Sequence, residues 1–183
     1  MGTQAASANL SVDIRAIVSN DMGNSTGTPT FLIGELITKS LTDGTSANQI
    51  DRVFSHRGRT LTSGNNSDID VFDFAGEDAG AGAGNDALGQ AVSLVEVVVL
   101  MVVNQATSVG NAVVGGEGSA AAFNAPFGGS DTATVTVRPG GLVLFVATVD
   151  PAYAVADSSN HLLRINALGG NITYDVHIFG RSA

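Results

Sequence analysis

Apolar and polar residues alternate along several short stretches of the chain, as they do in a strand with one buried face. Every second residue from Leu10 to Ala16 is apolar, and the residues between them are Ser, Asp and Arg. Threonine alternates with Ala or Val between Thr132 and Val137. Most apolar segments are short, rich in Val, Ile, Thr and Phe, and bounded by Gly, Asn, Asp or Ser, which is typical of strands and turns.

This pattern predicts a succession of strands with almost no helix. The predicted strands are residues 10–16, 31–41, 49–55, 59–63, 69–73, 91–103, 111–114, 132–137, 142–149, 162–166 and 171–179. The segment 142–149 is expected to be a core strand. Leu168-Gly169-Gly170-Asn171 reads as the turn of a hairpin that joins the last two strands.

The valine-rich run from Ala91 to Val103 is the most ambiguous segment, because periodicity does not separate a buried strand from a buried helix. Its many β-branched residues lower helix propensity, so we expect a long strand buried on both faces. Asp86–Gln90 is expected to form a turn or a single helical turn before it. The small, acidic segment from Gly76 to Asn85 is expected to be a surface loop.

Runs of strands with glycine-rich turns indicate an all-β fold, either a sandwich or a barrel. The length of 183 residues favours one domain. The first third of the chain is more polar and carries most of the basic residues. We therefore expect an N-terminal arm or strand extension over residues 1–59 and a β-sandwich over residues 60–183, with a single undivided domain as the alternative.

Charge narrows the range of partners. The chain has 17 acidic and 8 basic residues, a net charge of −9, and 14% charged residues. This balance argues against nucleic acid and against an anionic membrane surface. The apolar run 91–103 is too short to cross a bilayer as a helix, which needs about 20 residues. Exposed positions are mainly Ala, Gly, Ser, Thr and Asn, which suits close packing between copies, so a homo-oligomer is expected.

The sequence offers no strong catalytic, cofactor or metal constellation. Cysteine is absent, which excludes disulfides, thiolate metal sites and a Cys nucleophile. The nearest approach to a serine-nucleophile motif is Gly116–Ala120, around Ser119, and it departs from the required pattern. His56, His161 and His177 lack a second histidine at metal-binding spacing. The glycine-rich segment 79–84 lacks the Lys-Ser/Thr of a phosphate loop. No enzyme activity and no cofactor are predicted.

Two clusters of charged residues are candidate binding sites. Asp68 and Asp70 lie two residues apart and share one face of a predicted strand, so they could bind a hard cation such as Ca²⁺ or simply form a solvated edge. A local basic cluster contains Arg52, His56, Arg57 and Arg59. It is either a docking patch for an acidic partner surface or a pair of strand ends with exposed arginines.

Several strings between residues 60 and 180 carry a resemblance to a known group. They are LTSGNNSDIDVFDFAG, GNDALGQAVSL, VVGGEGSAAAFNAPFGGSDT, the turn RPGG, and NITYDVHIFG. Together they resemble small all-β virion proteins of tailed double-stranded DNA phages, such as capsid cement or decoration proteins. The resemblance implies a jelly-roll-like sandwich that forms a trimer and clamps neighbouring major capsid protein subunits. It places the protein on the capsid surface, with host cytoplasm as the site of assembly, and the N-terminal segment as an arm that reaches the shell.

A tail-associated module that binds a receptor or a glycan is the alternative. Sandwich folds host such sites readily. That function predicts a groove with exposed aromatic side chains, for which Tyr153 and Tyr174 are the candidates. A hydrolase ranks below both.

Overall fold

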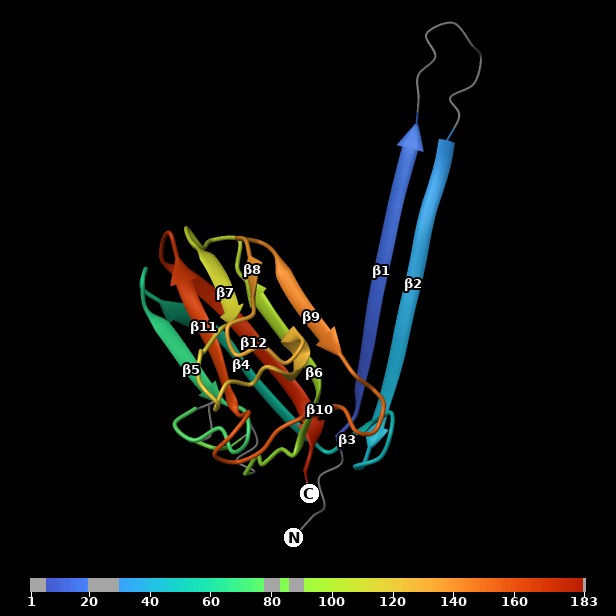
Figure 1. Cartoon of the computed structure of the whole chain (residues 1–183). Helices are drawn as coiled ribbons and strands as arrows, with labels where there is room; N and C mark the ends of the chain where they lie inside the picture. The colour runs from blue at the N-terminus through green and yellow to red at the C-terminus, as the bar shows by residue number, and fades with distance from the viewer. Residues whose placement is uncertain (1–5, 20–29, 78–82, 86–90, 183) are drawn as a thin grey trace, which may run out of the picture.

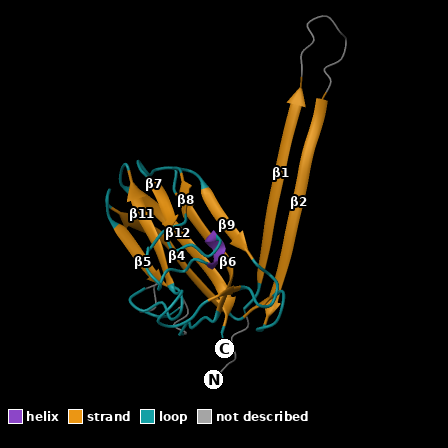
Figure 2. Ribbon diagram, viewed as in Figure 1, coloured by secondary structure: helices purple, strands orange, loops and turns teal. Residues whose placement is uncertain are grey.

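The computed structural model describes residues 6–19, 30–77, 83–85 and 91–182 of the chain. These residues form a β-sandwich body and a long two-stranded hairpin that stands away from it (Figure 1). Strands dominate, and the described residues contain no α-helix (Figure 2). The all-β prediction is therefore confirmed.

The elements follow one another along the chain as a series of strands with one 3-10 turn. They are β1 (Ala8–Ser19), β2 (Thr30–Asp43), β3 (Gln49–Ile50), β4 (Arg52–Leu61), β5 (Asn66–Asp70), β6 (Glu96–Asn104), β7 (Asn111–Gly115), η1 (Ala125–Phe127), β8 (Thr134–Val137), β9 (Leu142–Val146), β10 (Tyr153–Ala154), β11 (Leu162–Leu168) and β12 (Ile172–Arg181).

Two antiparallel sheets form the body. One has the order β10-β6-β12-β4, with β9 also paired to β6, and the other has the order β5-β11-β7-β8. Their inner faces supply one hydrophobic core, because alternate residues of each strand point inward. Ile165 of β11 and Val176 of β12 are both fully buried there. This is the sandwich that the sequence predicts, while the jelly-roll connections stay a prediction.

Strand β6 accounts for the valine-rich run. It begins at Glu96, later than predicted, and is buried on both faces as expected. Leu100 and Val102 join the core between the sheets. Val98 and Val99 face the other way, where the base of the hairpin covers them. The turn predicted at Asp86–Gln90 lies outside the described residues.

The predicted hairpin between the last two strands is wrong. β11 and β12 belong to different sheets, so the turn at Gly169 and Gly170 carries the chain across the core. The backbone of Gly170 lies so close to Gly110 that neither residue has room for a Cβ atom. A glycine-rich turn serves a crossover as well as a hairpin, because glycine accepts both backbone paths.

The predicted strands 49–55 and 59–63 are largely one strand. β4 pairs with β12 along its whole length, and a register shift at Tyr174/Val176 interrupts the ladder beside Gly58. Gly58 has a φ of 72°, which a bulge of this kind favours. The expected boundary between residues 59 and 60 falls inside β4. The predicted core strand 142–149 is shorter, ends at Val146, and is only half-buried. The described part of the chain contains no helix long and apolar enough to span a membrane.

Candidate interaction site at the hairpin and its groove

The hairpin exposes apolar side chains, since Leu36 and Ile37 of β2 are both exposed. β1 and β2 pair without interruption from Ala8↔Leu41 to Ser19↔Thr30. Twelve paired residues make a ribbon roughly 40 Å long at about 3.4 Å per residue. The ribbon rises beside the body, apart from it above the base, and its far end extends past the body (Figures 1 and 2). We call this ribbon, residues 8–19 and 30–43, the arm.

The base of the arm is anchored by a small apolar cluster. Leu41 at the end of β2 and Ile50 of β3 are buried against Val98 and Val99 of β6. Partly buried apolar residues surround these four, among them Ala8 and Phe179. The cluster fastens one end of the arm to the outer face of the β10-β6-β12-β4 sheet.

An apolar groove opens above this base, between the arm and the body. Its volume is about 560 Å³. The arm contributes Leu10, Val12, Ile37 and Lys39, which are cross-strand neighbours in the register Leu10↔Lys39 and Val12↔Ile37. The body contributes Leu144 and Val146 of β9 and residues 147–149. Lys39 is the only charged residue among those that line the groove, so it suits an apolar occupant.

The body wall of the groove is also an open sheet edge. Ala147 donates its N–H to the carbonyl of Val98 at 2.9 Å, which makes this a hydrogen-bonded pair of the β6–β9 ladder. Hydrogen-bonded and non-bonded pairs alternate in an antiparallel ladder. The backbone groups of Leu144 and Val146 therefore point away from β6. Within the described residues β9 pairs with β6 alone, so this edge can accept another strand.

Sequence reasoning missed the groove residues Ile37, Leu144 and Val146. The signal was present in the predicted strand 142–149, where apolar residues stand at consecutive positions rather than at every second one. Such a strand needs cover on both faces. The core covers Val143 and Phe145, and the groove is what faces Leu144 and Val146.

The structure divides the predicted basic cluster among different environments. The Arg59 guanidinium forms an ion pair with Glu77, hydrogen-bonds Ser67 at 3.0 Å and lies 5.7 Å from the centre of the Tyr174 ring. Arg52 forms an ion pair with Asp51 at 3.0 Å. His56 is half-buried, whereas Arg57 is exposed. Arg59 is therefore engaged in contacts within the body. Of the four residues in the predicted basic cluster, Arg57 is the exposed one.

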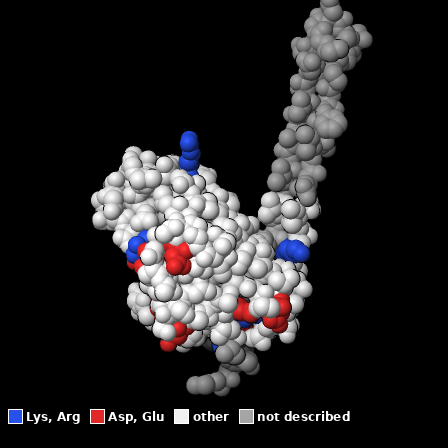
Figure 3. All heavy atoms as spheres, in the orientation of Figure 1, with Lys and Arg blue, Asp and Glu red and all other residues white. Residues whose placement is uncertain are grey.

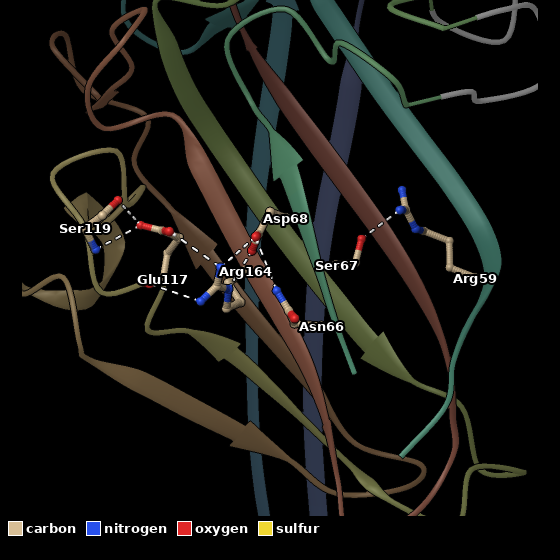
Figure 4. A network of polar contacts seen from close by, with 7 residues as sticks. All are labelled: Arg59, Asn66, Ser67, Asp68, Glu117, Ser119 and Arg164. Carbon is tan, nitrogen blue, oxygen red and sulfur yellow. Dashed lines mark hydrogen bonds and ion pairs between the residues drawn. The ribbon is translucent and has the colours of Figure 1, made fainter. Parts of the chain in front are cut away.

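Of the two predicted cation ligands, Asp68 is bound by an arginine of the same chain. Arg164 donates to both carboxylate oxygens of Asp68, at 2.6 and 2.7 Å, and to the carbonyl of Glu117 at 3.1 Å (Figure 4). The hydrogen bonds from Arg164 hold the pKa of Asp68 below its usual value. Asp70 accepts instead from the backbone N–H of Phe72 at 2.9 Å. Among the described residues no group of three or more His, Asp or Glu side chains gathers to hold a metal ion.

The candidate serine lies in the same network. Ser119 donates both its backbone N–H and its hydroxyl to the carboxylate of Glu117, within a loop (Figure 4). A different serine contacts a histidine: Ser55 Oγ lies 2.8 Å from His177 Nδ1, across strands β4 and β12. Burial lowers the pKa of His177, although the charge of Asp175 opposes this. Asp175 Oδ1 accepts from the N–H of Gly58 and from Gln105, and neither Ser55 nor His177 lines the groove.

The aromatic candidates for glycan binding do not form a platform. Tyr174 is fully buried in the core between the sheets, so its expected exposure is wrong. It points inward because it alternates with Thr173 and Asp175 on the central strand β12. Tyr153 is half-buried and packs against the same core.

Comparisons with known proteins identify no relative. No family model matches the chain, and no curated protein sequence or solved structure matches it.

Proposed function

We propose that this protein is a structural subunit of a larger assembly, a capsid cement or decoration protein of a tailed phage, and that the arm is its main contact element. The observation that carries the proposal is the arm itself. A two-stranded ribbon isolated in water is at best marginally stable, so this one needs a covering surface. Ile37 is 47% exposed and Leu36 is 61% exposed on the arm.

The covering surface is a second copy of this chain. Within the described residues no strand pairs with the outer edge of β9, and Leu36 and Ile37 of the arm are exposed, so one molecule carries both surfaces. Exchange of arms between copies satisfies both needs. Repeated around an axis, such a contact closes into a ring, and a trimer is the ring that the virion resemblance suggests.

The surface of the body supports this reading. The face seen in Figure 3 is largely free of charge, with Lys, Arg, Asp and Glu confined to a few small groups. Close contact with neighbours over such a face desolvates few charges, which keeps the cost of assembly low. The face complements a protein neighbour better than a polyanion.

The partner class comes from the resemblance to virion proteins. A subunit that binds the assembled capsid shell, and not its free subunits, stabilises the shell by mass action. The major capsid protein is accordingly the proposed second partner, and the capsid surface is the proposed location. The proposed role requires no catalytic step and no cofactor.

The mass of the protein in solution tests self-association. Ile37→Asp places a charge in the groove on an exposed position, so the body keeps its fold. We expect a trimer for the unchanged chain and a monomer for the variant, measured by light scattering after gel filtration. Thr136→Asp, on exposed β8, is the matched control and should remain a trimer. A monomer at every concentration of the unchanged chain would refute the exchange of arms.

The heat resistance of phage particles tests whether the protein stabilises the capsid through the major capsid protein. Phage particles stripped of this protein should lose resistance to heat, and adding back the unchanged chain should restore it. The Ile37→Asp variant should restore less. Stripped particles as heat-resistant as complete ones would remove the cement function while leaving self-association intact.

A further inference from the structure

We propose that Arg181 is a positioning residue that fixes the direction in which the arm leaves the body. Its side chain is 1% exposed, one of the most deeply buried in the molecule. Removing a guanidinium from water is costly unless its donors are satisfied. The inference rests on the proposed function for its biological meaning, but the direction of the arm can be measured without any partner.

Arg181 joins three segments near the base of the arm. Its Nη1 donates to Glu96 Oε2 of β6 at 2.6 Å. Its Nε donates to the carbonyl of Gln49 in β3 at 3.1 Å. Its Nη2 donates to the carbonyl of Val149 at 2.9 Å, in the loop after β9. The planar guanidinium fork thus ties β3, and through it the arm, to β6 and to the loop after β9.

Strand β3 links the arm to Arg181. β3 runs parallel to the end of β2, in the register Thr42↔Gln49 and Asp43↔Ile50. The carbonyl that Arg181 grips therefore belongs to the third strand of the arm's own sheet. A shift of Gln49 moves the end of β2 with it.

Bonds beside the fork reinforce the same junction. Asp51 donates its N–H to the carbonyl of Gly180 at 3.1 Å, and its carboxylate accepts from the N–H of Ser182 at 2.8 Å. Asn48 donates its N–H to the carbonyl of Thr148 at 2.8 Å. Residues 48–51 are thus bound on one side by the end of β12 and on the other by the loop after β9.

Direction needs these bonds because the apolar cluster at the base does not supply it. Burial of Leu41 and Ile50 is non-directional and tolerates a pivot. Above the base, the open groove separates the arm from the body. A small rotation at the base becomes a large displacement at the far end of a ribbon about 40 Å long. The guanidinium fork, with donors at fixed angles, prevents that rotation.

Paired spin labels test the inference on the isolated protein. The chain has no cysteine, so Thr38→Cys on the arm and Thr136→Cys on the body give two unique attachment sites. Labelled chains are mixed with an excess of unlabelled chains, so that only distances within one molecule are recorded. We expect a single narrow distance distribution for the otherwise unchanged chain. Arg181→Met should broaden it at least twofold.

Three further variants make the result decisive. Arg138→Met removes an exposed arginine from the body and should leave the distribution narrow. Arg181→Lys keeps the charge but loses the fork, so its distribution should stay broad; a narrow one would overturn the role of the fork. If Arg181→Met fails to fold, Arg181→Met with Glu96→Gln removes both charges of the buried pair. A folded variant lacking Arg181 with an unchanged distribution would overturn the inference, whatever the outcome for self-association.

Discussion

The body and the arm are both built from β-strands, but their apolar side chains are buried to different extents. In the body, alternate apolar residues of two sheets meet in one core, and Phe54, Ile165 and Ile178 are completely buried. In the arm, two consecutive apolar residues of β2 stay exposed, Leu36 and Ile37, and Ile37 lines the groove. The body therefore holds its fold by itself, whereas the arm depends on its anchored base and on whatever covers it. The proposed function thus assigns stability to the body and contact to the arm.

The largest expected effect comes from deleting a core side chain. Phe54 is fully buried and stacks on Phe74 with ring centres 4.1 Å apart. Phe54→Ala should lower the free energy of unfolding by about 3–5 kcal/mol, because it removes apolar contacts and leaves a cavity. The matched change on the arm, Ile37→Ala, should change that of the monomer by less than about 0.5 kcal/mol. Urea unfolding measures both, and equal losses would break the comparison between body and arm.

A smaller effect is expected at the ion pair on the outside of the body. The side chains of Asp68 and Arg164 are 29% and 24% exposed, so solvent screens much of their attraction. Asp68→Asn should lower the free energy of unfolding by about 0.5–1 kcal/mol at pH 7. The folded pKa of Asp68 lies below its unfolded value of 3.8, so this stabilisation is present above that pH. It is lost as the pH falls through the folded pKa.

The gap between Asp68→Asn and the unchanged chain should therefore narrow in urea unfolding as the pH falls below 3.8. Asp157→Asn, at an exposed position, is the control and should leave the unfolding midpoint unchanged. A gap of constant size down to pH 2 would show that the side-chain shape, and not the charge, matters at Asp68.

The smallest effect is expected at His177, on the outer face of β12. Burial sets its folded pKa below the unfolded value of 6.5, so the unfolded chain takes up the proton first as the pH falls. Stability should therefore decline as the pH drops from about 7 through 6.5 and below. His177→Gln should flatten this part of the pH profile of the melting temperature. Ser55→Ala keeps the imidazole and should keep the slope; a flat profile in the unchanged chain would contradict the assignment.

Local pattern predicted most of the strands but not their neighbours. The alternation around Leu10 and Val12 indicated a strand correctly, because it follows from side-chain direction along one strand. The turn at Gly169 and Gly170 is compatible with either a hairpin or a crossover between sheets. In the structure it is a crossover, and Gly170 packs closely against Gly110. Contacts of this kind join residues far apart in the sequence, which a local pattern does not record.

The candidate site was predicted least well, for the same reason. Arg59 looked like part of a basic surface because its charge partner, Glu77, stands in a different segment. Arg181 is a lone arginine just beyond the predicted strand 171–179, and its partners Gln49, Glu96 and Val149 come from three separate segments. Buried ion pairs and open sheet edges are properties of topology, and topology was the part that composition and spacing left open.

The central place of β12 bears on how the molecule is made. β12 lies between β4 and β6, and its partners in β4 precede it by more than 100 residues. Of the strands described, it is the last to leave the ribosome, so the sheet behind the arm is completed only after synthesis has passed Arg181. Such distant pairings raise the contact order and slow folding. On the proposed role of Arg181, the direction of the arm in a nascent chain is fixed only once β12 has paired with β4 and β6.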